Sequence, residues 1–87
     1  MTISFPPRQA FDFERLAVSF TADIDGNQVL CRISVEALED NYGCNGVEPV
    51  GCFQSNRYAI EAKAASLIDK KRFETDGSIL IRSADGP

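Results

Sequence analysis

The chain has 87 residues, of which 44% are hydrophobic and 25% are charged, as is typical of a soluble globular protein. This length excludes a second folded unit, because a domain takes roughly 50–200 residues, so we expect one domain over residues 1–87. Nine basic residues against 13 acidic ones give a net charge of −4, and the chain has no histidine. A strongly basic polyanion binder is therefore excluded, and the commonest general base and metal ligand is missing.

Residues 1–14 form an arm rich in phenylalanine, in which Phe5, Phe11 and Phe13 surround a pair of prolines. Thr2–Phe5 can form a short edge strand, since proline cannot continue strand pairing beyond it. The aromatic side chains predict that this arm packs onto the body of the domain. The arm does not resemble a secretory signal, and no stretch of the chain reaches the roughly 20 apolar residues of a membrane helix. We therefore expect a cytoplasmic protein that does not enter a membrane.

Residues 15–24 alternate between polar and apolar side chains, which is typical of a strand with one buried face, and residues 28–34 continue the pattern. A two-residue turn places every inward side chain opposite another inward one, whereas a three-residue turn would slip the pairing by one residue. Both Asp25-Gly26 and Gly26-Asn27 satisfy this condition, and we favour Asp25-Gly26 as a type I′ turn. The predicted cross-strand pairs are Val18 with Ile33, Phe20 with Cys31, and Ala22 with Val29.

A short helix is predicted directly after this hairpin. Ser34 precedes it as the N-cap, because a serine hydroxyl can accept a hydrogen bond from the first turn. Val35, Leu38 and Tyr42 follow at helical spacing, and Gly43 is placed to end the helix as a C-terminal cap.

A longer helix is predicted to begin at Pro49, since proline is preferred in the first turn of a helix. Apolar side chains recur close to helical spacing as far as Ile68, and the basic residues at positions 70–72 suit the negative end of the helix dipole. The pattern predicts one helix over residues 49–72, with Ser55 as a second start if the first turn is separate.

The remaining segment, residues 78–83, predicts a strand with Ile79 and Ile81 on one face, and we expect residues 84–87 to fray. The predicted fold is α+β, with an antiparallel sheet of three to four strands and one long and one short helix on one face. The elements follow the order strand, strand, helix, helix, strand, and Thr2–Phe5 supplies the additional N-terminal strand. The predicted core consists of Leu16, Val18, Phe20, Val29, Cys31, Ile33, Leu38, Phe53, Ile60, Leu67, Ile68, Ile79 and Ile81.

The three cysteines do not form a familiar metal-binding pattern. Cys44 and Cys52 lie eight positions apart, Cys31 lies on the inward strand face, and no histidine completes a zinc site. We expect no metal and no cofactor. An odd number of cysteines and a reducing cytoplasm predict three free thiols. A helix start can lower the pKa of Cys52, so Cys44 and Cys52 are candidates for thiol chemistry, beside the simpler interpretation that both are incidental.

The segment Gly43-Cys44-Asn45-Gly46 has the GxxG spacing with which KH domains clamp a nucleic-acid backbone between two helices. Phosphate binding requires positive potential, yet residues 34–56 contain several carboxylates and neither lysine nor arginine. The simpler interpretation is a helix cap followed by a turn.

The open face of the predicted sheet gathers arginine and hydroxyl side chains, provided that Ile79 and Ile81 point inward. Such a surface can bind an anionic ligand or an acidic segment of a partner, although a solvated face is the simpler interpretation. The candidate binding residues are Arg15, Ser19, Thr21, Arg32 and Arg82.

Three stretches resemble the small bacterial family catalogued as domain of unknown function 1488: the opening TISFP, the junction CRISVEAL and the ending DGSILI. The resemblance extends over nearly the whole chain. It implies a compact α+β domain in a proteobacterial cytoplasm, and it implies no activity and no catalytic or binding residues.

The sequence favours a small non-enzymatic module that acts by contacting another protein or a second copy of itself. No histidine or nucleophile–base set is present, and a domain of this size gains from additional burial in a complex. The alternative is a nucleic-acid or anionic-ligand binder that uses the arginine-bearing face or the GxxG loop, with nucleic acid disfavoured by the net charge.

Overall fold

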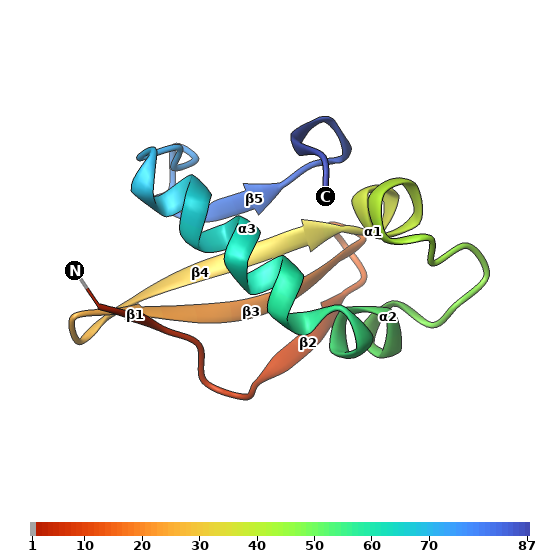
Figure 1. Cartoon of the computed structure of the whole chain (residues 1–87), viewed down its shortest axis with the longest axis horizontal. Coiled ribbons are helices and arrows are strands. Elements are labelled where there is room, and N and C mark those ends of the chain that lie inside the picture. The colour runs from red at the N-terminus through yellow and green to blue at the C-terminus, as the bar shows by residue number, and fades with distance from the viewer. Residues whose placement is uncertain (1) are drawn as a thin grey trace.

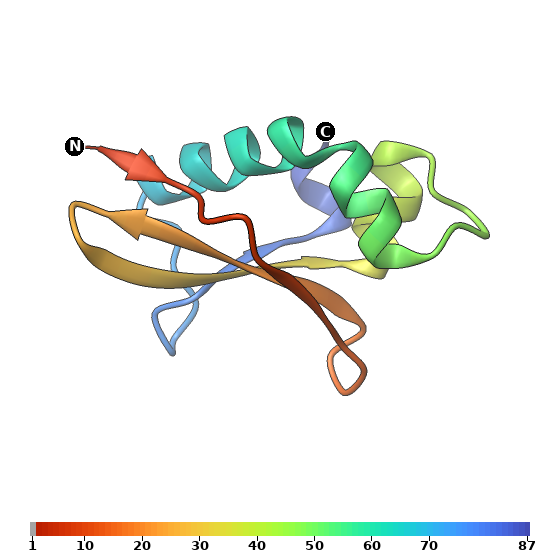
Figure 2. The same cartoon turned by 90° about the horizontal axis from the view of Figure 1, so that it is seen from below.

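The computed structural model of the protein describes residues 2–87 and shows an α+β fold with a five-stranded sheet. All helices lie on one face of the sheet, and the other face is open (Figures 1 and 2). The strands are β1 (Ile3–Ser4), β2 (Gln9–Asp12), β3 (Ala17–Ile24), β4 (Asn27–Ser34) and β5 (Ile79–Ile81). The helices are α1 (Val35–Tyr42), α2 (Pro49–Ser55) and α3 (Arg57–Asp69), followed by a 3₁₀ turn, η1 (Ser83–Asp85).

The hairpin of β3 and β4 has the predicted register. Ala22 lies opposite Val29 and Ile24 lies opposite Asn27, so the connecting turn has two residues. Both turn residues have positive φ, 51° at Asp25 and 91° at Gly26, as a type I′ turn requires.

The sheet is mixed rather than antiparallel, which corrects the predicted topology. β5 pairs with β4 in parallel, and Arg32 lies opposite Leu80. Figure 1 shows the reason: α3 runs back along the sheet against the direction of β4, so that the strand after it runs in the same direction as β4. Parallel neighbours need such a helical crossover.

The predicted long helix is two helices. α2 ends and α3 begins at Asn56, where φ is −115° and ψ is 19°, outside helical geometry. The break lies one residue after Ser55, and neither Ser55 nor Asn56 caps α3 through its side chain. The shorter helix α1 agrees with the prediction at both ends, since the Ser34 hydroxyl accepts from Ala37 N and Gly43 is left-handed with φ 68°.

The N-terminal arm pairs with β3 in two pieces, β1 and β2. The predicted edge strand is therefore present as Ile3–Ser4, and β2 is an additional strand that the sequence analysis did not identify. Phe5 and Phe11 pack against the core, as expected of the arm, whereas the side chain of Phe13 is exposed.

The core lies between the inward face of the sheet and the helices, and Phe53 is its largest fully buried side chain. Leu16 was expected in the core, and this prediction is wrong, because 59% of Leu16 is exposed. Its φ of 48° places it in the β2–β3 turn, and strand β3 begins only at Ala17.

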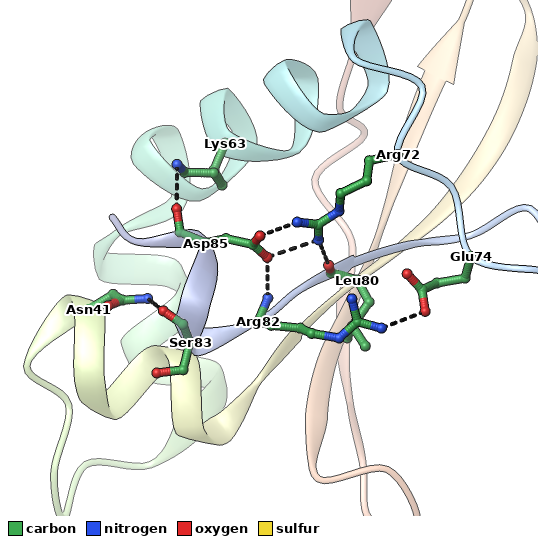
Figure 3. A network of polar contacts seen from close by, with 8 residues as sticks. All are labelled: Asn41, Lys63, Arg72, Glu74, Leu80, Arg82, Ser83 and Asp85. Carbon is green, nitrogen blue, oxygen red and sulfur yellow. Dashed lines mark hydrogen bonds and ion pairs between the residues drawn. The ribbon is translucent and has the colours of Figure 1, made fainter.

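The C-terminal turn η1 is bonded to the body of the domain through Ser83 and Asp85. Arg72 forms an ion pair with Asp85 through Nη1 and Nη2, and Nη2 also donates to the carbonyl of Leu80 over 2.7 Å (Figure 3). Lys63 Nζ donates to the Asp85 carbonyl over 3.0 Å, and Asn41 donates to the Ser83 carbonyl over 3.0 Å. These contacts tie η1 to α1, α3 and β5.

Candidate binding cleft

Two connections extend beyond the open face of the sheet on the side away from the helices (Figure 2). One is the β2–β3 turn, and the other is the segment between α3 and β5. They frame a cleft of about 430 Å³. Its lining residues are Arg15, Ala17, Arg32, Ser34, Glu74, Thr75, Asp76, Ser78 and Leu80.

Arg32 lies on the floor of this cleft, in the central strand β4. Its side chain is only 13% exposed, and its Nε atom is buried with no hydrogen-bond partner among residues 2–87. The carboxylate of Asp12 is 4.0 Å from that nitrogen, too far for a hydrogen bond. The period-two pattern of β4 explains this position, because Cys31 and Ile33 occupy the buried face and Arg32 must therefore face the open side.

Arg15 lines one wall of the cleft, and Asp12, which is not itself a lining residue, holds it there. Asp12 accepts from the backbone N–H groups of Glu14 and Arg15 over 3.0 and 3.1 Å, and its other oxygen pairs with the Arg15 guanidinium over 3.1 Å. The hydrogen bond from the Arg15 backbone, aided by the Arg15 side chain, lowers the pKa of Asp12. Asp12 is therefore a fixed anion that holds the turn.

The opposite wall consists of residues 74–78. Ser78 donates to Asp76 through its hydroxyl over 2.6 Å and through its backbone N–H over 3.0 Å. These two bonds, with a smaller contribution from the charge of Arg32, lower the pKa of Asp76. Glu74 pairs with Arg82 over 2.7 Å, so the carboxylate and the guanidinium satisfy each other.

A second cleft of about 430 Å³ lies on the same face beside the N-terminal arm. Ser19, Thr21 and Leu30 contribute from the sheet, and Arg8 contributes from the arm. The Ser19 hydroxyl is already bonded to the carbonyl of Ala10 over 3.2 Å, which leaves less polar capacity for a ligand here.

The five predicted binding residues thus divide into three places. Arg15 and Arg32 line the first cleft, and Ser19 and Thr21 line the second. Arg82 is exposed and paired with Glu74 beyond the end of β5 (Figure 3). The open face therefore has the predicted composition without forming one continuous site.

The prediction of three free thiols is wrong. Cys44 and Cys52 form a disulfide with a Cα–Cα distance of 6.0 Å, and only Cys31 is a free cysteine. The left-handed conformation of Gly43 ends α1 and turns the chain so that Cys44 reaches Cys52 in α2. The spacing of the two cysteines along the chain could not reveal this contact. Gly43-Cys44-Asn45-Gly46 is consequently a helix cap and a cross-linked turn.

Sequence reasoning missed two aspartates at the first cleft: Asp12, which holds Arg15 in place, and Asp76, which lines the opposite wall. Asp12 lies three residues before Arg15, and Asp76 lies two residues before Ser78. Both spacings are typical of aspartates that bond the backbone a few residues ahead in a turn. That signal was available in the sequence, whereas the approach of the two turns to Arg32 was not.

Among residues 2–87, no helix is long and apolar enough to span a membrane. The same residues contain no group of three or more cysteine, aspartate or glutamate side chains arranged to hold a metal ion.

Comparison with known proteins relates the whole domain to a family of unknown function. The family profile "Protein of unknown function (DUF1488)" matches residues 3–81. The uncharacterised protein YrdB of Escherichia coli K12 and its counterpart in Shigella flexneri are each 32% identical over 82 residues, covering 91% of this chain and 94% of theirs. A crystal structure of a DUF1488 protein from Shewanella loihica PV-4 superposes with a TM-score of 0.81 at 26% identity, covering 91% of this chain and 90% of that one. The chain belongs to the DUF1488 family, whose function is unknown.

Proposed function

We propose that this protein is a non-enzymatic binding module that contacts a partner protein through the first cleft, where Arg32 receives a carboxylate side chain of the partner. One observation carries the proposal: the guanidinium of Arg32 is largely buried and its Nε has no hydrogen-bond partner. A buried polar group without a partner costs free energy, and an incoming acceptor would remove that cost.

A carboxylate suits this position for geometric reasons. A guanidinium presents its N–H donors in a planar fork that matches two carboxylate oxygens. The carboxylate of Asp12 lies on the same side at 4.0 Å but is already engaged by the Arg15 turn. An acidic side chain entering between the two turns would therefore find a guanidinium that has an ion-pair partner in Asp12 but an Nε without a hydrogen bond.

The charges around the cleft favour a single carboxylate over a nucleic acid or another polyanion. Glu74 and Asp76 line the same cleft, and the depressed pKa of Asp76 keeps that group ionised at neutral pH. Glu74 and Asp76 would repel a ligand that carries several phosphates, whereas a single carboxylate is enough to form a hydrogen bond with Arg32. The GxxG segment offers no alternative site, since it is closed by the Cys44–Cys52 bond.

The titratable groups of the cleft support binding rather than acid–base catalysis. A general acid or base near neutral pH needs a carboxyl group whose pKa is raised toward 7. The pKa values of Asp12 and Asp76 are shifted downward by hydrogen bonds, which makes both groups permanent anions. Their role in this proposal is to hold the two walls.

The test compares Arg32→Met with a matched control, Lys70→Met. Methionine retains an unbranched apolar stem and removes the positive charge, and Lys70 is an exposed cation after α3 that lines neither cleft. Tagged wild-type protein and both variants would be cross-linked in the bacterium that makes them, and the captured partner would be identified and purified. The dissociation constant of this partner from the wild type and from each variant would then be measured by calorimetry.

We expect Arg32→Met to weaken this affinity by about tenfold or more, as for loss of one charge-assisted contact, and Lys70→Met to leave it nearly unchanged. Equal affinity for the wild type and Arg32→Met would overturn the proposal. A second copy of this chain can also be the partner, in which case light scattering would detect a dimer that Arg32→Met abolishes. We place this binding in the cytoplasm, and recovery of the tagged protein in a periplasmic fraction would contradict that location.

A further inference from the structure

The disulfide joins two different kinds of structure. Cys44 lies in the exposed connection between α1 and α2, whereas Cys52 lies within α2. Cys44 is 8% exposed with exposed neighbours on both sides, and Cys52 is 1% exposed with its face toward the core. An attacking group from solvent therefore approaches the sulfur of Cys44 in preference to that of Cys52.

Asn56 adds a polar group to this apolar site. Its side-chain nitrogen lies 3.9 Å from each sulfur and donates to the carbonyl of Cys52 over 2.9 Å. Asparagine is a preferred N-cap residue, yet Asn56 does not cap α3 although it precedes that helix. Its amide nitrogen instead bonds the Cys52 carbonyl and has both sulfurs within 3.9 Å.

We propose that Cys44–Cys52 is a site of reversible thiol–disulfide exchange with a low-molecular-weight thiol of the glutathione class, in which Cys44 is attacked and Cys52 is the leaving group stabilised by Asn56. This inference is independent of the binding proposed at Arg32, because the residues of the two sites do not overlap.

The thiolate of the external thiol attacks Cys44 Sγ, a new S–S bond forms, and the Cys44–Cys52 bond breaks with its electron pair on Cys52. The Cys52 thiolate accepts the Asn56 amide hydrogen bond and is protonated by water. A second external thiolate attacks the external sulfur of the mixed disulfide and releases Cys44, which is also protonated. Two external thiols become one disulfide, and the protein gains two electrons and two protons.

Asn56 has a defined role in this scheme. A leaving thiolate departs faster when it is stabilised, and an N–H donor within reach of Cys52 Sγ provides that stabilisation. Asn56 does not react with the thiol, so it is a positioning residue. Reduction frees the α1–α2 connection from α2 while Phe53, the next residue in α2, remains buried in the core.

Cys31 serves as an internal control. It lies on β4 with 0% exposure, inside the sheet, and is not part of the disulfide. A reagent that enters the fold without selectivity, or only after unfolding, would modify Cys31 together with the pair.

The experiment treats the oxidised native protein with reduced glutathione and follows the disulfide by mass spectrometry after alkylation. We expect reduction in the absence of denaturant, with Cys31 unmodified. We expect Asn56→Ala to slow reduction about threefold or more, through loss of the stabilised leaving group. Circular dichroism would check that this variant stays folded, and Asn45→Ala, in the neighbouring loop, is the matched control with an unchanged rate.

A second measurement does not depend on Asn56. Cys52→Ser leaves Cys44 free, and Cys44→Ser leaves Cys52 free, so each can form a mixed disulfide with oxidised glutathione. We expect the Cys44 thiol to react about tenfold faster, because access limits exchange. Equal rates for the two thiols, or reduction of the wild type that occurs only as fast as global unfolding, would overturn the proposal.

Discussion

Arg72 and Asp85 form an ion pair in which both guanidinium NH groups meet both carboxylate oxygens (Figure 3). The same guanidinium donates to the carbonyl of Leu80, on the edge strand β5. One side chain therefore holds the C-terminal turn and occupies an acceptor of the sheet edge. Exposed strand edges are sites of unwanted pairing, so this contact also protects the edge.

We expect Asp85→Asn to lower the free energy of unfolding by about 1–2 kcal/mol at neutral pH, the range for hydrogen bonds to a charged group that is partly exposed. The hydrogen bond from Arg72 lowers the pKa of Asp85 in the folded state. The unfolded state therefore binds this proton first as the pH falls, so the contribution is complete above about pH 4 and is lost as the pH drops through the folded value. Urea titrations between neutral and acid pH would measure it.

The matching control is Asp69→Asn, at the exposed end of α3. It should leave the free energy of unfolding at neutral pH close to that of the wild type. If Asp85→Asn loses stability in acid as steeply as the wild type does, the Arg72 pair does not contribute as described.

Arg32→Met should weaken binding without lowering stability. The buried Nε makes no hydrogen bond and is 4.0 Å from the Asp12 carboxylate, so its removal relieves a desolvation cost at the loss of one long ion pair, while methionine keeps the apolar stem. We expect the free energy of unfolding to stay within about 0.5 kcal/mol of the wild type or to rise. Chemical denaturation would show this, and a loss of more than about 2 kcal/mol would mean that Arg32 is a structural ion-pair partner.

Ser34→Ala should remove the N-cap of α1. The Ser34 hydroxyl accepts from Ala37 N over 3.0 Å, and loss of such a cap costs about 0.5–2 kcal/mol. Ser34→Thr retains the acceptor and should recover most of that stability. Urea unfolding of the three proteins would decide, and equal stability of the alanine and threonine variants would contradict the capping role.

Gly26→Ala should destabilise the β3–β4 hairpin through its backbone alone. Gly26 has φ +91°, and an added methyl group would meet no atom within 4 Å. The left-handed conformation costs a residue other than glycine about 1–2 kcal/mol. Gly51→Ala in α2 is the control, because that position has ordinary helical geometry and alanine is the better helix former. Thermal unfolding should therefore shift downward for the first variant and not for the second.

The Cys31 thiol should resist alkylation in the folded protein. Burial raises the pKa of Cys31 to about 12, which leaves roughly one thiol in ten thousand ionised at pH 8. Iodoacetamide should modify it only after denaturant is added, as mass spectrometry would show. Rapid modification of the native protein would contradict this assignment.

The same shift predicts a loss of stability in alkali. The unfolded thiol ionises above about pH 9 while the folded one stays protonated, so the unfolded state binds fewer protons and the free energy of unfolding falls as the pH rises. Cys31→Ala should show a weaker alkaline decline than the wild type.

The sequence by itself determined the local elements of this protein. The alternation of residues 17–34 specified a hairpin and its register, because a slip of one residue would turn every buried side chain outward. The hydroxyl of Ser34 and the missing Cβ of Gly43 specified both ends of α1. The outward position of Arg32 followed from the same alternation.

Only the tertiary structure decided how distant segments meet. The direction of β5 depends on the path of α3 across the sheet, which a helical pattern does not contain. The Cys44–Cys52 disulfide and the Arg72–Asp85 ion pair form because turns place residues that are distant in the sequence next to each other. Leu16 is exposed for a related reason: its apolar side chain fits the strand pattern, but the turn that joins β2 to β3 requires a positive φ at its position and turns it to solvent.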